Sequence, residues 1–229
     1  MTKATPTAKP IDPARKVRIV LWILLAAIVG AGLIWYAVFT ATKPEPETLQ
    51  QVADAPLVRD DSHRLTTPST EKAQLVEFLD FECEACRAAV PLVEELKEEF
   101  GHRITFVNRY FPLPSHKNSG QATLAVEAAA QQGKYEQMAD KMFETQPQWG
   151  EKQEFQNALF RTFAEELGLD MEKYDAAVAS EATKDRIRKD IADGKALGVT
   201  GTPTFFLNGE KLVLNSEEQF RQFLSDAAE

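Results

Sequence analysis

The stretch AQLVEFLDFECEACRAAVPLVEELKEEF, residues 73–100, decides the fold. Its first part, residues 73–81, is a nearly continuous apolar run, which predicts a buried β-strand. In residues 83–100, apolar side chains recur at helical spacing and a glycine follows, so this part predicts a helix. The only two cysteines of the chain, Cys83 and Cys86, are therefore predicted to lie where a buried strand ends and a helix begins.

The order of elements further along the chain predicts an α/β fold. The segment ITFVNRYF, residues 104–111, reads as a second strand, and so short a strand–helix–strand unit implies parallel pairing. Residues 117–197 have helical patterns throughout. TPTFFLNGEKLVL then predicts a hairpin around Asn208 and Gly209, followed by a capped final helix. We predict a thioredoxin-like fold with an inserted α-helical domain.

The region before this domain differs sharply in composition. Residues 1–18 are polar, basic and proline-containing, and we interpret them as a cytoplasmic tail. Residues 40–56 resemble a linker, and the domain is predicted over residues 57–229. The whole chain carries a net charge of −9, and an acidic domain argues against a nucleic-acid partner.

Residues 19–39 contain no charged side chain and predict a transmembrane anchor. A helix of this length spans roughly 31 Å, about the thickness of a hydrocarbon core. A cleavable signal peptide is the alternative, but its apolar part is usually shorter and ends in a small-residue cleavage site. The basic flank should stay in the cytoplasm, which places the domain outside, where disulfides persist. We expect a single-pass protein of the cell membrane with an extracytoplasmic domain.

Three uses of the cysteine pair compete with a free buried pair that has no role, although two core cysteines would rarely fall at this spacing just after a strand. A structural zinc site is disfavoured, because two cysteines and three histidines offer no second closely spaced ligand pair. A purely structural disulfide would close a very small loop and constrain the unfolded chain little. A redox pair fits best, since a helix N-terminus stabilises a thiolate. Cys83 would then be exposed and exchange disulfides, and Cys86, one turn further on, would be shielded and resolve the mixed disulfide.

The sequence resembles the DsbA-type branch of thioredoxin-fold thiol–disulfide oxidoreductases, of the membrane-anchored, BdbD-like type. The resemblance covers residues 57–229 and rests on VEFLDFECEAC, RYFPL, QQGKYEQMADKMF and GVTGTPTFFLNG. It implies a cis Pro203 beside the two cysteines, with Thr202 pairing with substrate; a trans proline that opens a strand is the alternative. It also implies that Glu77 lies buried beneath Cys86 and accepts its proton, unless this side chain faces solvent.

Residues near the cysteines are predicted to contact substrate or to alter the thiol. Glu84 and Ala85 lie between the cysteines, and Phe81 is expected to form an apolar rim. Relatives that are strong oxidants often carry an imidazole between the cysteines. Here Glu82 and Glu84 predict a Cys83 pKa that is higher than in a Glu84→His variant. His116 matches a family position, and it either caps the inserted helices or lines the groove.

These observations predict a protein disulfide oxidoreductase that forms disulfides in secreted proteins through Cys83 and Cys86. The dithiol carries the electrons, so we expect no organic cofactor and no metal. The resemblance implies cysteine-containing secreted proteins as substrates and a quinone-linked membrane protein, DsbB- or VKOR-like, as the reoxidising partner. The alternatives are a disulfide reductase or isomerase kept reduced by a membrane electron donor, and a non-catalytic, chaperone-like binding module.

Overall fold

The computed structural model describes residues 22, 25, 29–33, 35–36 and 55–229. The chain divides into two units, Met1–Glu47 and Thr48–Glu229. The predicted tail, most of the predicted anchor and nearly all of the predicted linker lie outside the described residues. Within the described part of the chain, no helix is both long and apolar enough to cross a membrane.

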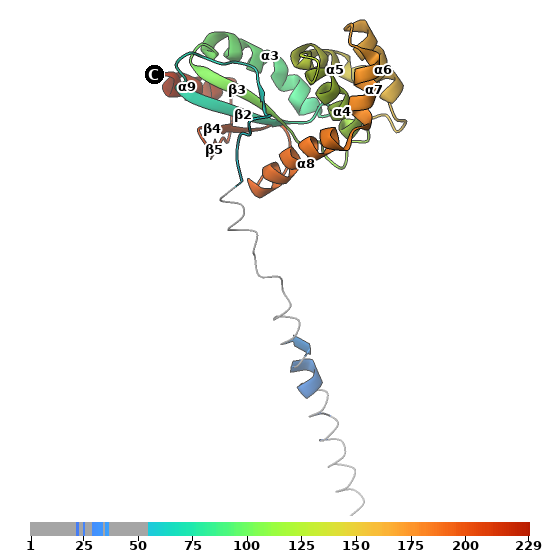
Figure 1. Ribbon diagram of the computed structural model, residues 1–229. Helices are drawn as coiled ribbons and strands as arrows, with labels where there is room; N and C mark the ends of the chain where they lie inside the picture. The colour runs from blue at the N-terminus through green and yellow to red at the C-terminus, as the bar shows by residue number, and fades with distance from the viewer. Residues whose placement is uncertain (1–21, 23–24, 26–28, 34, 37–54) are drawn as a thin grey trace, which may run out of the picture. The chain divides into compact units, whose positions relative to one another are not determined.

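The second unit is built on a mixed β-sheet (Figure 1). Its strands are β1 (His63–Arg64), β2 (Ala73–Leu79), β3 (Ile104–Tyr110), β4 (Thr204–Leu207) and β5 (Glu210–Lys211). The strand order is β1-β3-β2-β4-β5, with β2 and β3 parallel and the other pairs antiparallel. The apolar run predicted as a buried strand forms the central strand β2, so the expected parallel unit is confirmed.

One hydrophobic core lies between this sheet and two helices that pack against it. These are α3 (Glu84–Phe100) and α9 (Glu217–Ala228), which contact each other. Leu75 and Phe106 of the sheet pack with Leu96 of α3 and Phe220 of α9. Ser216 caps α9 by accepting a hydrogen bond from the Gln219 backbone, as its sequence predicts.

The remaining helices lie between β3 and β4 and form a second compact part beside the sheet (Figure 1). They are α4 (Ser119–Ala130), α5 (Tyr135–Trp149), α6 (Asn157–Glu166), α7 (Met171–Ala179) and α8 (Glu181–Ala196). Their core contains the fully buried Trp149 and Phe160, packed edge to face. Cys83 and Cys86 belong to this same core, so the inserted helices help to bury the cysteine pair.

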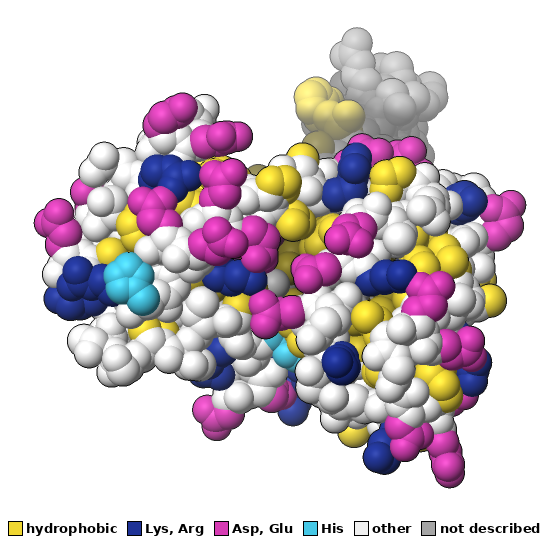
Figure 2. All heavy atoms as spheres, turned by 90° about the horizontal axis from the view of Figure 1, so that it is seen from above, with side chains coloured by type: hydrophobic (Ala, Val, Ile, Leu, Met, Phe, Trp, Pro, Cys, Tyr) yellow, Lys and Arg dark blue, Asp and Glu magenta, His cyan; other side chains and the backbone are white. Residues whose placement is uncertain are grey.

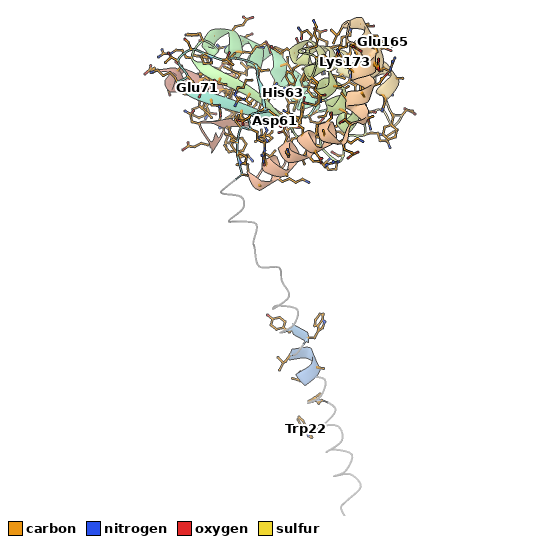
Figure 3. The ribbon with its side chains drawn as sticks, in the orientation of Figure 1. Trp22, Asp61, His63, Glu71, Glu165 and Lys173 are labelled. Atoms are coloured by element: carbon orange, nitrogen blue, oxygen red, sulfur yellow. The ribbon has the colours of Figure 1, made fainter. Side chains whose placement is uncertain are left out.

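Turn chemistry and local sequence explain one confirmed strand pair and one missed strand. Asn208 and Gly209 have φ angles of 51° and 91°, the left-handed conformations that a tight hairpin turn requires, and β4 and β5 pair across them. Strand β1 has two residues and no apolar run, so its sequence gave no signal. Figure 3 labels His63 of this strand. Its ring forms a hydrogen bond with the Glu127 carboxylate of α4 and stacks on Tyr135 of α5.

A buried arginine fastens the start of the domain to the sheet. Arg109 of β3 has no exposed surface, and its guanidinium donates to Asp190 at 2.7 Å and to Asp193 at 2.5 Å. It also donates to the backbone carbonyls of Pro56 and Leu57, at 3.1 and 2.7 Å. One side chain thus joins the first described residues of the domain to both β3 and α8.

Candidate active site

The two cysteines lie at the start of α3, as the sequence predicts. Cys83 is the N-cap residue, with extended backbone angles, and its N–H donates to the Asp80 carbonyl at 3.1 Å. Cys86 lies in the first turn. The expectation that Cys83 is exposed is wrong: its relative exposure is 7%, against 1% for Cys86. Two other segments cover Cys83. Its sulfur lies 3.3 Å from the Thr202 carbonyl, and its own carbonyl accepts a hydrogen bond from Gln146 of α5.

The two sulfurs are free thiols with very different acidities. The Cys86 thiol donates a hydrogen bond to Cys83, and this bond, with help from Thr202 and the backbone N–H groups of Cys86 and Ala85, lowers the pKa of Cys83 to about 5. Burial, together with the proton that it shares with Cys83, raises the pKa of Cys86 far above its usual value. At neutral pH the first sulfur is a thiolate and the second holds its proton.

The loop before β4 completes the surroundings of Cys83. The Thr202–Pro203 peptide bond is cis, as the resemblance implies. The Thr202 hydroxyl is buried and has no partner at hydrogen-bond distance, yet it is close enough to the Cys83 sulfur to favour its ionised form. Thr202 and Pro203 are both half-buried, so part of this loop stays accessible beside the cysteines.

A carboxyl group lies behind the cysteines. Glu77 of β2 is 8% exposed, and burial, the Cys83 thiolate and Glu94 raise its pKa to about 8. It lines a cavity of about 40 Å³ that also borders Tyr135 and Asp140 of α5. Figure 2 shows carboxylates gathered around a hollow on the face that carries α3 and α5. Glu77 therefore holds a proton at neutral pH, next to a space large enough for water.

The three residues next to the cysteines that were predicted to contact substrate differ in their exposure to solvent. Glu84 and Ala85 are exposed. Phe81 has no exposed surface, and its ring packs 5.2 Å from the ring of Phe143 in α5. The prediction that Phe81 forms a rim for substrate is wrong, because inserted helix α5 covers it. The sequence around Phe81 gives no sign of this distant contact.

Two buried side chains hold the inserted helices against the cysteines, a role that sequence reasoning gave to neither of them. Gln146 of α5 donates to the Phe81 carbonyl at 2.8 Å and to the Cys83 carbonyl at 3.0 Å. Glu82 is 2% exposed, and its carboxylate accepts the backbone N–H groups of Asn118 and Glu151, at 2.6 and 3.0 Å. Glu82 was expected to act on Cys83 as a nearby charge; instead, its carboxylate serves as a bridge to two other segments.

The structure contradicts one of the two positions expected for His116, the helix cap. It does not cap the inserted helices, because α4 begins at Ser119 after the N-cap residue Asn118. Its ring nitrogen Nδ1 lies 2.7 Å from the Asp80 carboxylate, and Asp80 has no exposed surface. The interpretation of His116 as a helix cap is therefore wrong, and the ring lies in the loop that follows β3.

A central buried strand, a cysteine pair at the start of the next helix and a cis proline beside them define a thioredoxin-fold protein. The family model described as Thioredoxin matches residues 69–226, and the chain belongs to that family.

Known proteins resemble this chain in sequence and in structure. The Na⁺/H⁺ antiporter NhaA 1 of Mycobacterium sp. (strain KMS) is 34% identical over 87% of this chain and 32% of the antiporter. The chain thus spans about a third of the length of the curated relatives that it matches. A thioredoxin-like oxidoreductase from Silicibacter pomeroyi DSS-3 is 25% identical over 80% of this chain and 97% of its own, with a TM-score of 0.62. Oxidised BdbD from Bacillus subtilis has the same fold, with 18% identity, coverage of 73% and 92%, and a TM-score of 0.64.

Proposed function

We propose that this protein is a thiol–disulfide oxidoreductase that oxidises pairs of cysteines in other proteins. The observation that carries the proposal is the asymmetry of the two sulfurs. Cys83 has a pKa lowered to about 5, whereas burial keeps Cys86 protonated. A dithiol whose reduced form contains a stabilised thiolate gives up its disulfide readily, so the pair is a good oxidant.

The reaction starts from the Cys83–Cys86 disulfide and exchanges bonds between sulfurs. A substrate thiolate attacks the sulfur of Cys83, and the bond between Cys83 and Cys86 breaks. The electron pair goes to Cys86, which takes the proton that Glu77 holds. A second substrate thiolate then attacks the substrate sulfur of the mixed disulfide, and Cys83 leaves as a thiolate. The substrate gains one disulfide, and the protein gains two electrons, which a membrane protein linked to quinone would remove.

We place the oxidase outside the cytoplasm on a membrane anchor formed by residues 19–39, as in BdbD-like proteins. Support comes from the exposed apolar side chains of that region, among them Trp22, Leu25 and Leu33, which a bilayer would cover. Secreted proteins with cysteines are the expected substrates, and a DsbB- or VKOR-like protein is the expected partner. Antiport is not part of the proposal, since the chain spans only about a third of the length of the relatives with that name.

Equilibration of the full chain with glutathione buffers tests this function. We expect a reduction potential above about −200 mV, because the thiolate of Cys83 is stabilised relative to an ordinary thiol. A value near that of thioredoxin, about −270 mV, would assign a reductase instead. A Cys86→Ser variant should accumulate mixed disulfides with secreted proteins in cells, and a Cys83→Ser variant, its matched control, should not. Full retention of the protein's activity in cells by Cys83→Ser would favour the non-catalytic binding module instead.

A further inference from the structure

A buried carboxylate holds the imidazole of His116 in a fixed position. Asp80, which has no exposed surface, accepts from His116 Nδ1 at 2.7 Å and from the Leu113 backbone at 2.9 Å. Its other oxygen accepts from the Glu82 backbone at 2.8 Å and from the Ser119 hydroxyl at 2.5 Å. A carboxylate with all its partners in place cannot turn, so the ring it binds is fixed in both orientation and tautomer.

The same aspartate fixes the first cysteine. The Asp80 carbonyl accepts the N–H of Cys83 at 3.1 Å, so one residue bonds to the nucleophile through its backbone and to the imidazole through its side chain. The His116 ring is 28% exposed, which leaves it partly shielded from water. Cys83 and His116 are therefore close in space, although 33 positions of sequence separate them.

Negative charges surround the ring. Burial opposes a positive charge on His116, but the hydrogen bond to Asp80 and the charges of Asp80, Cys83 and Glu82 outweigh it, so the pKa of His116 is raised. The Cys83 thiolate thus favours the imidazolium, and by reciprocity the imidazolium must favour the thiolate by the same free energy.

We propose that His116, oriented by Asp80, is the electrostatic partner of the Cys83 sulfur and stabilises it as a thiolate. The inference rests on the proposed function, because it concerns the step in which Cys83 leaves. The sulfur–sulfur bond of the mixed disulfide breaks there, and its electron pair stays on Cys83. His116 neither gains nor loses a proton in this step; its positive charge lowers the energy of the new anion.

This arrangement answers a question that the sequence raised. Glu84 and Ala85, the two residues between the cysteines, supply no imidazole and no cation. The chain supplies the imidazole instead from the loop after β3, through Asp80. We therefore assign Asp80 as the positioning residue and His116 as a residue that acts directly on the charge of the reacting sulfur.

The first arm of the test measures the Cys83 thiolate. The ultraviolet absorbance of the thiolate is followed against pH in the reduced full chain and in His116→Gln. The matched control is His102→Gln, which replaces an exposed histidine in the turn before β3. We expect the pKa of Cys83 to rise by about 0.5–1 unit in His116→Gln, which is about a 3- to 10-fold loss of thiolate at pH below that pKa. The control should match the wild type.

The second arm measures the histidine. The chain has three histidines, so their ring signals can be separated by nuclear magnetic resonance, and through-bond experiments on the isotope-labelled wild type assign His116. In Cys83→Ser, the pKa of His116 should fall by the same amount as the pKa of Cys83 rises in His116→Gln. Because this arm leaves His116 in place, it decides the question even if His116→Gln does not fold.

The outcomes separate the inference from the proposed function. Equal and opposite shifts in the two arms support it. An unchanged pKa of His116 in Cys83→Ser overturns it, whatever happens to Cys83 in His116→Gln, because a one-sided shift reports only a structural disturbance. A wild-type chain that exchanges disulfides normally, with no coupling between the two groups, refutes the inference and leaves the function standing. Coupling without any exchange activity refutes the function alone.

Discussion

Two groups of buried charges lie beside strand β3, and they are neutralised in different ways. In the first, which we call the arginine cluster, Arg109 and Arg186 pair with Asp190, and Arg59 and Arg109 pair with Asp193. Although burial opposes ionisation, Arg59 and Arg109 hold the pKa of Asp193 below its usual value. Every charge in this cluster has a partner of opposite sign at hydrogen-bond distance.

The second group surrounds the cysteines and is mostly acidic. Asp80 and Glu82 are held chiefly by backbone N–H groups. Glu77 is buried with a pKa raised to about 8, and Cys83 is an anion with a pKa lowered to about 5. His116 faces this group; although burial opposes its positive charge, the hydrogen bond to Asp80 and the nearby negative charges raise its pKa. We call these five residues the acidic group.

The comparison separates structural charges from chemical ones. In the arginine cluster, the pKa values of Arg59 and Arg186 are raised and that of Asp193 is lowered, so the ion pairs favour the charged forms of these side chains. Glu77 and Cys83 have pKa values displaced in opposite directions, and such pairs of groups are arranged to move protons near neutral pH. Breaking the first group should therefore alter stability, and changing the second should alter pH dependence.

The largest expected effect comes from removing the arginine at the centre of the arginine cluster. Arg109→Met leaves Asp190 and Asp193 buried with one partner fewer each, so the free energy of unfolding should fall by about 3–5 kcal/mol. Urea unfolding of the full chain measures this. The matched control Arg188→Met, on the exposed side of α8, should leave the unfolding free energy unchanged. A loss no larger than the control's would mean that the cluster does not stabilise the fold.

Replacing the buried acid should change the slope of stability with pH. The pKa of Glu77 is about 8 in the folded chain, above the ordinary value of 4.5, so between those values the folded form binds more protons than the unfolded form. Wild-type stability from this group therefore falls as pH rises from about 4.5 to about 8. Glu77→Gln lacks this loss and should be more stable than the wild type at pH 8 by up to about 4 kcal/mol.

Urea unfolding at pH 4.5 and pH 8 tests this slope. The two proteins should have similar stability at the lower pH and diverge at the higher one. Glu98→Gln, an exposed residue of α3, is the control and should follow the wild type at both. Parallel curves for Glu77→Gln and the wild type would show that Glu77 ionises like an exposed carboxyl.

A smaller effect is expected at the bridge between the cysteines and the inserted helices. The Glu82 carboxylate accepts hydrogen bonds from the backbone N–H groups of Asn118 and Glu151. In Glu82→Gln, an amide N–H must face one of these donors, so the free energy of unfolding should fall by about 1–2 kcal/mol. Hydrogen exchange of the Asn118 and Glu151 amides should accelerate with it. Glu154→Gln, exposed in the same loop, is the control; equal exchange in both variants would contradict the bridge.

Much of the sheet could be predicted, because its signals are local. The apolar run before Cys83 becomes β2, and the Asn208–Gly209 pair becomes the turn between β4 and β5. The burial of Glu77 in β2 followed from its place in that run and from the family resemblance. Local patterns of two residues were too short to reveal β1.

The rest depends on contacts between distant residues, which no local pattern encodes. Phe81 was expected at the surface, and only the packing of α5 against it explains its burial. Glu82 reads as a solvated acid until Asn118 and Glu151 are brought to it. The bond between Asp80 and His116 likewise joins the loops that follow the neighbouring parallel strands β2 and β3. The tertiary arrangement of the inserted helices, more than their existence, was beyond the reach of sequence reasoning.

The hydrogen bonds from Arg109 to the carbonyls of Pro56 and Leu57 have a mechanical consequence. Any force applied to the chain on the N-terminal side of the domain enters at these two residues. It is resisted there by β3 and α8 through Arg109, whose guanidinium bonds to Asp190 and Asp193 as well as to the two carbonyls. Such a force would therefore be carried first by Arg109 and its two aspartates, which lie in β3 and α8 and not in the segment from β2 to α3 that holds the two sulfurs.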